Sequence, residues 1–336
     1  MADVIIERDE PVVVPARRPQ RTRLPAPLRV PILIVLNLGI KAMLWQAASS
    51  FLSPELGYVS KAPTDDDLYS LYSPLARLIT KIATVYITWA RGYDFYDVSA
   101  LAILTNAPYA YLLLTYYQVT ALTVAAHMNI EVLSIAIPTY LLRSRAPAHR
   151  SNVPLRNRFL LNSVWVQSTN ALLAVCVYAV TIYVAQRTGV LNSFLVTYFD
   201  IPSLEAAYLE NQFTVAAKIF AAGFAAKEFL LNPSIAAQSE SGPVTLVEPF
   251  DSSTADLKAT LKHNFWYFDR RTKTLIKQTW FLCAFQVATT TQLCMTLSGA
   301  EFNGAAGYAG LWAMANVILA SWWVWVGDTD TDYEVN

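Results

Sequence analysis

Long apolar runs recur eight times along the chain, without the alternation of apolar and polar positions that marks a half-buried strand. A run of about 20 apolar residues is long enough to cross the roughly 30 Å hydrocarbon layer as a helix. Helices satisfy all of their backbone hydrogen bonds in that layer. The pattern therefore predicts an all-α fold, a polytopic integral membrane helical bundle. The eight predicted spans cover residues 30–52, 72–90, 98–116, 120–142, 162–185, 212–232, 278–298 and 305–326.

Basic residues near the span ends predict the orientation of these helices, because Lys and Arg concentrate in cytosolic loops. Arg17–Arg29 precede the first span, Arg143–Arg158 follow the fourth, and Lys258–Lys277 precede the seventh. An even number of spans separates each basic segment from the next. We therefore expect both termini in the cytosol. The span at 72–90 is interrupted by two basic residues. Without it, however, an odd number of spans would separate the first basic segment from the second.

The segments outside the spans divide the chain into five parts. The Pro- and Arg-rich start is typical of an extended or disordered cytosolic tail. Leu257, Leu261 and Phe265 recur at helical spacing among basic residues, which predicts an amphipathic helix on the membrane surface or a cytosolic extension of the seventh span. The predicted parts are a tail at 1–29, spans one to six at 30–232, a cytosolic loop with the basic helix at 233–277, spans seven and eight at 278–326, and an acidic cytosolic tail at 327–336.

Composition narrows the classes of function. Of the 336 residues, 54% are hydrophobic and 15% charged, against roughly 25% charged in an ordinary soluble domain. The net charge is zero, and the basic clusters adjoin apolar spans, so we expect no nucleic-acid partner. Three cysteines and three histidines show no metal-ligand spacing, and no glycine-rich phosphate loop occurs, so we expect no metal and no cofactor. The rather short spans favour a thin membrane, such as the endoplasmic reticulum.

Two opposite charges lie at the middle of predicted spans. Lys41 is central in the first span and Glu131 in the fourth. Because an unpaired charge is costly in lipid, we expect Lys41 and Glu131 to be close in space. Asn37 lies one turn before Lys41, and His127 one turn before Glu131, so each pair shares one helix face.

Three further cations lie in the outer half of the membrane: Arg77, Lys81 and Lys218. Together with Lys41 and His127 they predict a positively charged cavity for an anionic headgroup or phosphate. A simpler interpretation is that the cations reach for the interface and the central pair only sets helix register. Lys227 and Glu228, at the cytosolic end of the sixth span, are expected to extend into the interface.

An acidic cluster, Asp65-Asp66-Asp67, lies in the outer loop before the second span. Clustered carboxylates can hold a divalent cation or act as a general base. Over these three residues and the topology, the chain resembles the first lumenal loop of integral-membrane glycosyltransferases that use polyprenyl-phosphate sugars. The chain is short for that class and lacks its large lumenal domain, and a solvated acidic loop is the simpler interpretation.

The absence of a catalytic constellation favours a non-enzymatic multi-pass protein that handles a lipid or an anionic solute, or assists the assembly of membrane proteins. Anionic lipid headgroups are expected at Arg17–Arg29 and Lys258–Lys277. Small residues in the later spans also allow a partner helix or a second copy of the chain. Two alternatives stay open: a lumenal lipid-linked transferase that uses Asp65–Asp67, and an ion-coupled carrier that uses His127 and Glu131.

Overall fold

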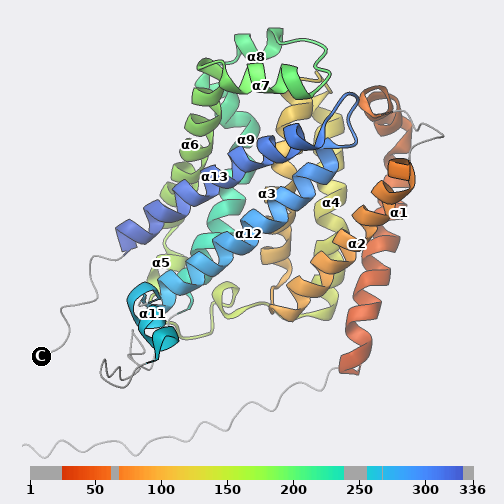
Figure 1. Ribbon diagram of the computed structural model, residues 1–336. Coiled ribbons are helices and arrows are strands. Elements are labelled where there is room, and N and C mark those ends of the chain that lie inside the picture. Colours follow the sequence, from red (N-terminus) through yellow and green to blue (C-terminus); the bar gives the residue numbers. More distant parts are fainter. Residues whose placement is uncertain (1–24, 62–67, 238–255, 267, 328–336) are drawn as a thin grey trace, which may run out of the picture.

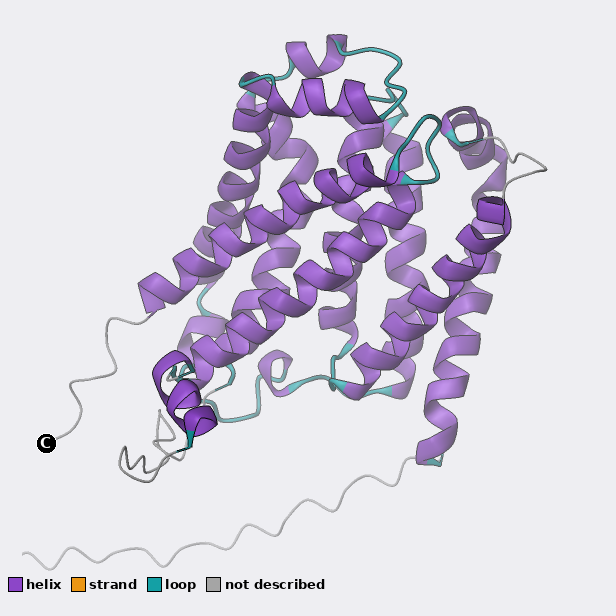
Figure 2. Ribbon diagram, in the orientation of Figure 1, coloured by secondary structure: helices purple, strands orange, loops and turns teal. Residues whose placement is uncertain are grey.

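The computed structural model describes residues 25–61, 68–237, 256–266 and 268–327, and this part of the chain is 82% helical without a strand (Figures 1 and 2). The predicted all-α class is confirmed. Among the described residues, five helices are long and apolar enough to cross a membrane. They are α1 (Ala26–Val59), α3 (Phe95–Thr115), α4 (Ala121–Leu142), α6 (Val164–Arg187) and α13 (Phe302–Gly327).

The other three predicted spans are also helical, but they are shorter or more polar. They are α2 (Leu68–Ala90), α12 (Arg270–Cys294), and α9 (Gln212–Ala226), which continues through a π-helical turn η2 (Lys227–Leu231) into α10 (Asn232–Ile235). The short elements are η1 (Pro147–His149), α5 (Arg158–Asn162), α7 (Val190–Tyr198), α8 (Glu205–Leu209) and α11 (Leu257–Phe265). α11 is therefore a helix of its own, distinct from the start of α12.

Contacts between helix ends establish the directions of α1 to α4, and Figure 1 shows those of the remaining helices. The Glu55 carboxylate at the end of α1 accepts a hydrogen bond of 3.0 Å from the backbone N–H of Thr120, just before α4. The Arg143 guanidinium, just after α4, donates to the carbonyls of Trp89 near the end of α2 and Tyr93 just before α3. Successive long helices therefore run in alternating directions between the two ends of the bundle.

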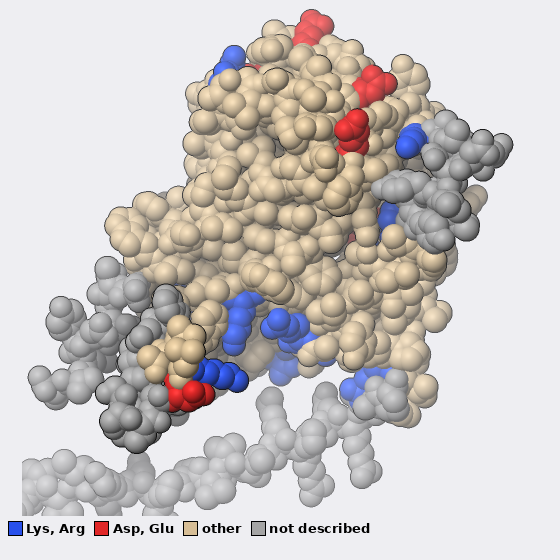
Figure 3. All heavy atoms as spheres, in the orientation of Figure 1, with Lys and Arg blue, Asp and Glu red and all other residues tan. Residues whose placement is uncertain are grey.

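The two ends of the bundle differ in charge. At the basic end lie the start of α1, the start of α12 and the end of α13, where the Arg271 guanidinium donates to the Gly327 carbonyl at 3.1 Å. In Figure 3 most Lys and Arg side chains lie towards this end, and acidic side chains, apart from a group beside α11, lie towards α7 and α8. The basic end carries Arg91, Arg143, Arg145, Arg150, Arg158, Arg270 and Lys273, and the opposite, acidic end carries Glu55, Asp200, Glu205, Glu210 and Glu301.

α3 is the most buried of the five candidate spans and packs against α4, α9 and α12. Its first turn is fixed by a capping box, in which the Asp94 carboxylate accepts from the Asp97 N–H and the Asp97 carboxylate accepts from the Asp94 N–H. Such a cap satisfies backbone donors that the first turn leaves open. α3 therefore begins at a defined residue of the basic end.

Candidate functional site

Two lysines and one glutamate from three helices meet halfway along the bundle. Lys41 of α1 forms an ion pair with Glu131 of α4, as their equal depth in the sequence indicated. Lys81 of α2 donates to the other carboxylate oxygen of Glu131 at 2.7 Å. The Glu131 residue is only 6% exposed. One carboxylate therefore serves two cations from two different helices.

A cavity of about 110 Å³ adjoins this cluster. Its charged lining consists of three cations, Lys41, Arg77 and Lys81, and one carboxylate, Glu131, so the lining carries two positive charges in excess. The remaining polar lining comes from α2, α3 and α12 and consists of Thr80, Thr84, Thr105, Asn106, Thr289 and Gln292. Three of the predicted residues, Lys41, Arg77 and Lys81, thus line one cavity beside α2.

Asn37 and His127 lie outside that lining. The Asn37 amide donates to the Ser134 carbonyl at 2.7 Å and so joins α1 to α4. The His127 ring is buried between aromatic rings, with its centroid 6.1 Å from that of Trp45 and 5.7 Å from that of Tyr109. The two polar stripes follow the α1–α4 interface, and only their ends at the ion pair reach the cavity.

The expectation that Lys218 joins the same cavity is wrong. Lys218 forms an ion pair with Glu210 at the acidic end of the bundle and donates to the Thr115 hydroxyl at 2.9 Å. The Tyr111 hydroxyl donates to the same glutamate at 2.7 Å. α9 packs against α3 and α6, which directs Lys218 away from α1 and α2. The sequence predicted how deep Lys218 lies in the membrane, but it could not predict which neighbouring helix its side chain faces.

The expectation that Lys227 and Glu228 extend into the interface is also wrong. Lys227 is 3% exposed, donates to the Glu228 carboxylate at 2.6 Å, and lies 4.3 Å from the centroid of the Phe224 ring. The second carboxylate oxygen of Glu228 accepts from the Asn232 amide at 2.6 Å. The π-helical turn begins at Lys227, and its wider winding gives these side chains directions that a continuous α-helix would not.

The acidic residues Asp65, Asp66 and Asp67 lie outside the described residues. The structure therefore provides no geometry for a lumenal transferase site.

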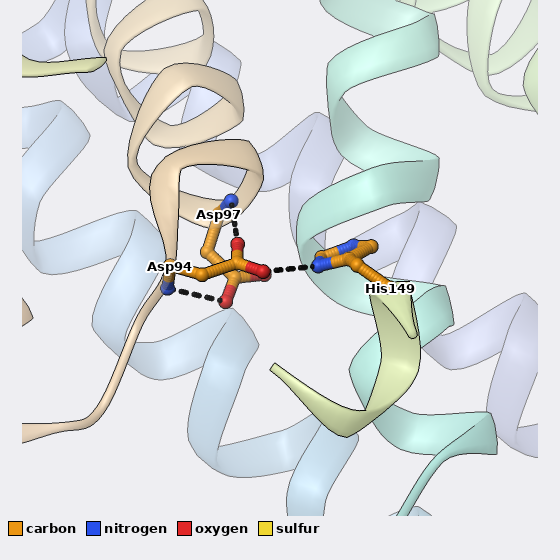
Figure 4. A group of neighbouring side chains, drawn as sticks. All are labelled: Asp94, Asp97 and His149. Atoms are coloured by element: carbon orange, nitrogen blue, oxygen red, sulfur yellow. Dashed lines mark hydrogen bonds and ion pairs between the residues drawn. The ribbon is translucent and has the colours of Figure 1, made fainter. Parts of the chain in front are cut away.

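A cluster of Asp94, Asp97 and His149 at the basic end was missed by the sequence analysis (Figure 4). One Asp94 oxygen caps α3, and the other accepts from the Ala146 N–H at 2.8 Å and lies 2.7 Å from His149 Nδ1. The loop after α4 is thereby fastened to the start of α3. The sequence did contain a signal: Asp94-x-x-Asp97 is a capping pattern, and parity places His149 at the same end of the bundle.

Two members of the cluster, Asp94 and His149, form a charged hydrogen-bonded pair. Burial opposes the charge on His149, but the hydrogen bond to Asp94 and the nearby Glu228 carboxylate outweigh it and raise the pKa of His149 to about 9. Burial would raise the pKa of Asp94, but the bond to His149 and two backbone N–H groups lower it. A tetrahedral Zn²⁺ at about 2.1 Å from each ligand would hold its ligands roughly 3.4 Å apart. The 2.7 Å contact is too short for that and fits a charge-assisted hydrogen bond.

Comparison of the chain with protein-family models, with curated proteins and with solved structures gave no match. The function is therefore argued from the site alone.

Proposed function

We propose that this chain is an eight-span membrane protein with both ends in the cytosol, and that it binds an anionic group beside Lys41, Arg77 and Lys81 without catalysing a reaction on it. The cavity with two excess positive charges is the observation that carries the proposal.

The eight-span topology is supported by the alternating directions of the helices. The start of α1 and the end of α13 lie towards the same, basic end, as an even number of crossings predicts. Basic loops mark the cytosolic side of membrane proteins. The three helices with more polar sequences, α2, α9 and α12, contribute buried or cavity-lining side chains, which accounts for their lower hydrophobicity.

Electrostatics favours an anion in the cavity. A charge at membrane depth costs a few kcal/mol unless it is paired, and Glu131 neutralises only one of the three cations. A group with one or two negative charges would compensate the rest. Arg77 suits this task, because a guanidinium binds planar or tetrahedral oxyanions through two hydrogen bonds.

The size of the cavity restricts the ligand. About 110 Å³ is well above the roughly 10–15 Å³ that one water requires, and below the roughly 300 Å³ at which pockets for drug-sized ligands begin. The space suits a phosphate or carboxylate group and excludes a whole lipid. The group is either a free anion or the headgroup of a lipid whose chains remain outside the bundle.

Equilibrium binding to the protein in phosphatidylcholine nanodiscs tests the proposal and separates the two sources of the anion. One arm uses radiolabelled inorganic phosphate, and the other uses labelled phosphatidylglycerol. Arg77→Gln removes a cavity cation that makes no pair with Glu131, so the fold should persist. Arg91→Gln is the matched control, since Arg91 follows the same helix but does not line the cavity.

We expect at least tenfold weaker binding in Arg77→Gln and unchanged binding in Arg91→Gln, in whichever arm the wild-type protein binds. The proposal fails if neither probe binds the wild-type protein, or if the two variants bind equally well.

The proposal also covers the lipids that surround the protein, its compartment and its topology. The basic segments Arg17–Arg29 and Lys258–Lys277 would contact anionic lipids of the cytosolic leaflet, each basic residue contributing about 1 kcal/mol near the surface. The short spans favour the endoplasmic reticulum.

Tags at the two ends, read after selective permeabilisation of the plasma membrane, should both be accessible. Tags in opposite compartments would contradict the topology.

A further inference from the structure

A second and larger cavity, of about 460 Å³, opens at the basic end of the bundle. It lies among η1, the junction of α5 and α6, and the turn in which α9 passes into η2. His149, Lys227, Glu228 and Asn232 form its polar side. Its volume falls within the roughly 300–1,000 Å³ range of small-molecule sites. π-Helical turns such as η2 occur frequently at functional sites.

The charges around this cavity are already compensated. His149 is paired with Asp94 at 2.7 Å, and Lys227 is paired with Glu228 at 2.6 Å. Each cation thus has a carboxylate within hydrogen-bond distance. In contrast to the cavity beside Arg77, this one offers no excess charge, so electrostatics favours an uncharged ligand.

Two polar atoms of the residues that line this cavity lack hydrogen-bond partners among the described residues. His149 Nδ1 is occupied by Asp94, and Nε2 is buried without a hydrogen-bond partner among the described residues. Asn232 is 6% exposed, and its Oδ1 is likewise unpartnered while its amide nitrogen is bound to Glu228. His149 Nε2 lies 3.8 Å from the nearer Glu228 oxygen, too far for a direct hydrogen bond. A donor and an acceptor are therefore left open, and a hydroxyl group complements both.

The surroundings of the cavity are apolar on the membrane side. Val164 and Phe224 contribute to its lining and are 79% and 49% exposed. Phe220 and Phe213 continue the exposed stripe along α9, at 54% and 77% exposure, four and seven residues apart. This stripe leads from the cavity towards the membrane interior, where an acyl chain can lie against it.

We propose that this cavity binds a membrane lipid with an uncharged, hydroxyl-bearing headgroup. The hydroxyls bond to His149 Nε2 and Asn232 Oδ1, and the acyl chain lies along Phe224 and Phe220 of α9. The site is separate from the anion cavity, which is formed by other residues of the bundle.

The test measures equilibrium binding of a fluorescent monoglucosyl diacylglycerol to the full chain in phosphatidylcholine nanodiscs. Ser168 lies at the rim of the cavity, and Thr169 is the next residue of α6 and does not line it. Both side chains are exposed and donate to the Trp165 carbonyl. Ser168→Phe should weaken binding at least tenfold by filling the entrance, whereas Thr169→Phe should bind as the wild-type protein does.

A second variant tests the hydrogen-bond role. Asn232→Leu keeps the side-chain size but removes the Oδ1 acceptor together with the amide that donates to Glu228, so the affinity for the glucolipid should fall about tenfold. Unlabelled phosphatidylglycerol at equal concentration should not displace the glucolipid, and Arg77→Gln should bind it normally.

Three outcomes would overturn the proposal: no saturable binding by the wild-type protein, equal binding by Ser168→Phe and Thr169→Phe, or equal displacement by phosphatidylglycerol. Unchanged affinity in a folded Asn232→Leu protein would also overturn it. Because the anion test uses Arg77→Gln and a different probe, either proposal can fail while the other stands.

Discussion

Lys81 Nζ lies 2.7 Å from an oxygen of Glu131, so that α2 is joined to α4 by an ion pair at the middle of the bundle. α2 has few other contacts in the bundle, principally with α1 and α12. This pair, together with the hydrogen bond from Gln292 of α12 to Thr80 at 2.7 Å, therefore holds the middle of the helix that closes the anion cavity.

Replacement of Glu131 by Gln should destabilise the protein, because it leaves Lys41 and Lys81 without their common partner. Breaking a fully buried pair costs about 3–5 kcal/mol. We expect about 2–3 kcal/mol here, since the side chains of Lys41 and Lys81 are 35% and 22% exposed and reach solvent or headgroups. Thermal unfolding in detergent measures the change. Asn129→Ala, an exposed change on the same helix, is the control, and equal melting temperatures for the two variants would contradict the structural role of Glu131.

The sequence predicted the long helices and their order, and five of them are long and apolar enough to cross a membrane. It did not predict the short helices α7 and α8. It also predicted the Lys41–Glu131 pair, because equal depth and opposite charge are both properties of sequence. Lys218 was misplaced because depth does not specify which neighbour a helix face meets.

The cluster of Asp94 and His149 was missed for a related reason. A residue in a loop has no helical period to fix its direction, so the path of residues 143–163 across the basic end could not be derived. Lys81 was placed in the outer half of the membrane, yet it reaches the centre because its long side chain and the tilt of α2 carry its ammonium to Glu131.

Stability should depend on pH through the pair of His149 and Asp94. His149 has its pKa raised from 6.5 to about 9, so its contribution is fully present below pH 6.5 and is lost as the pH rises through 9. The lowered pKa of Asp94 acts in the opposite sense, and its contribution is lost as the pH falls below its folded value. A shift of this size corresponds to on the order of 3 kcal/mol between pH 6 and pH 10.

Thermal unfolding between pH 6 and pH 10 checks this expectation. The melting temperature of the wild-type protein should fall over that range, and His149→Gln, which has no charge to lose, should show a much flatter profile. Parallel profiles for the two proteins would contradict the role of His149.

A close approach of α6 and α9 should make Gly223 intolerant of a side chain. A Cβ atom there would lie 2.6 Å from the backbone nitrogen of Val175 and 2.8 Å from its Cα, and these backbone atoms cannot move without separating the helices. We expect Gly223→Ala to cost about 1–3 kcal/mol. Gly39→Ala on α1 is the control, because it meets no atom within 4 Å and should be neutral or stabilising by up to about 1 kcal/mol. Chemical or thermal unfolding of the two variants compares them, and similar losses in both would refute the close packing.

A substitution of Lys218 should lower the stability of the protein without changing its affinity for anions. Its ammonium pairs with Glu210, which also accepts from the Tyr111 hydroxyl and is 6% exposed. Lys218→Met leaves that carboxylate with neutral donors only, so we expect a loss of about 1–3 kcal/mol in stability. Because Lys218 lies at the acidic end and outside the anion cavity, the affinity for phosphate or phosphatidylglycerol should remain that of the wild-type protein. Unfolding and anion binding measured on the same preparation separate the two effects. A folded Lys218→Met protein that binds anions tenfold more weakly would show that this lysine belongs to the anion site after all.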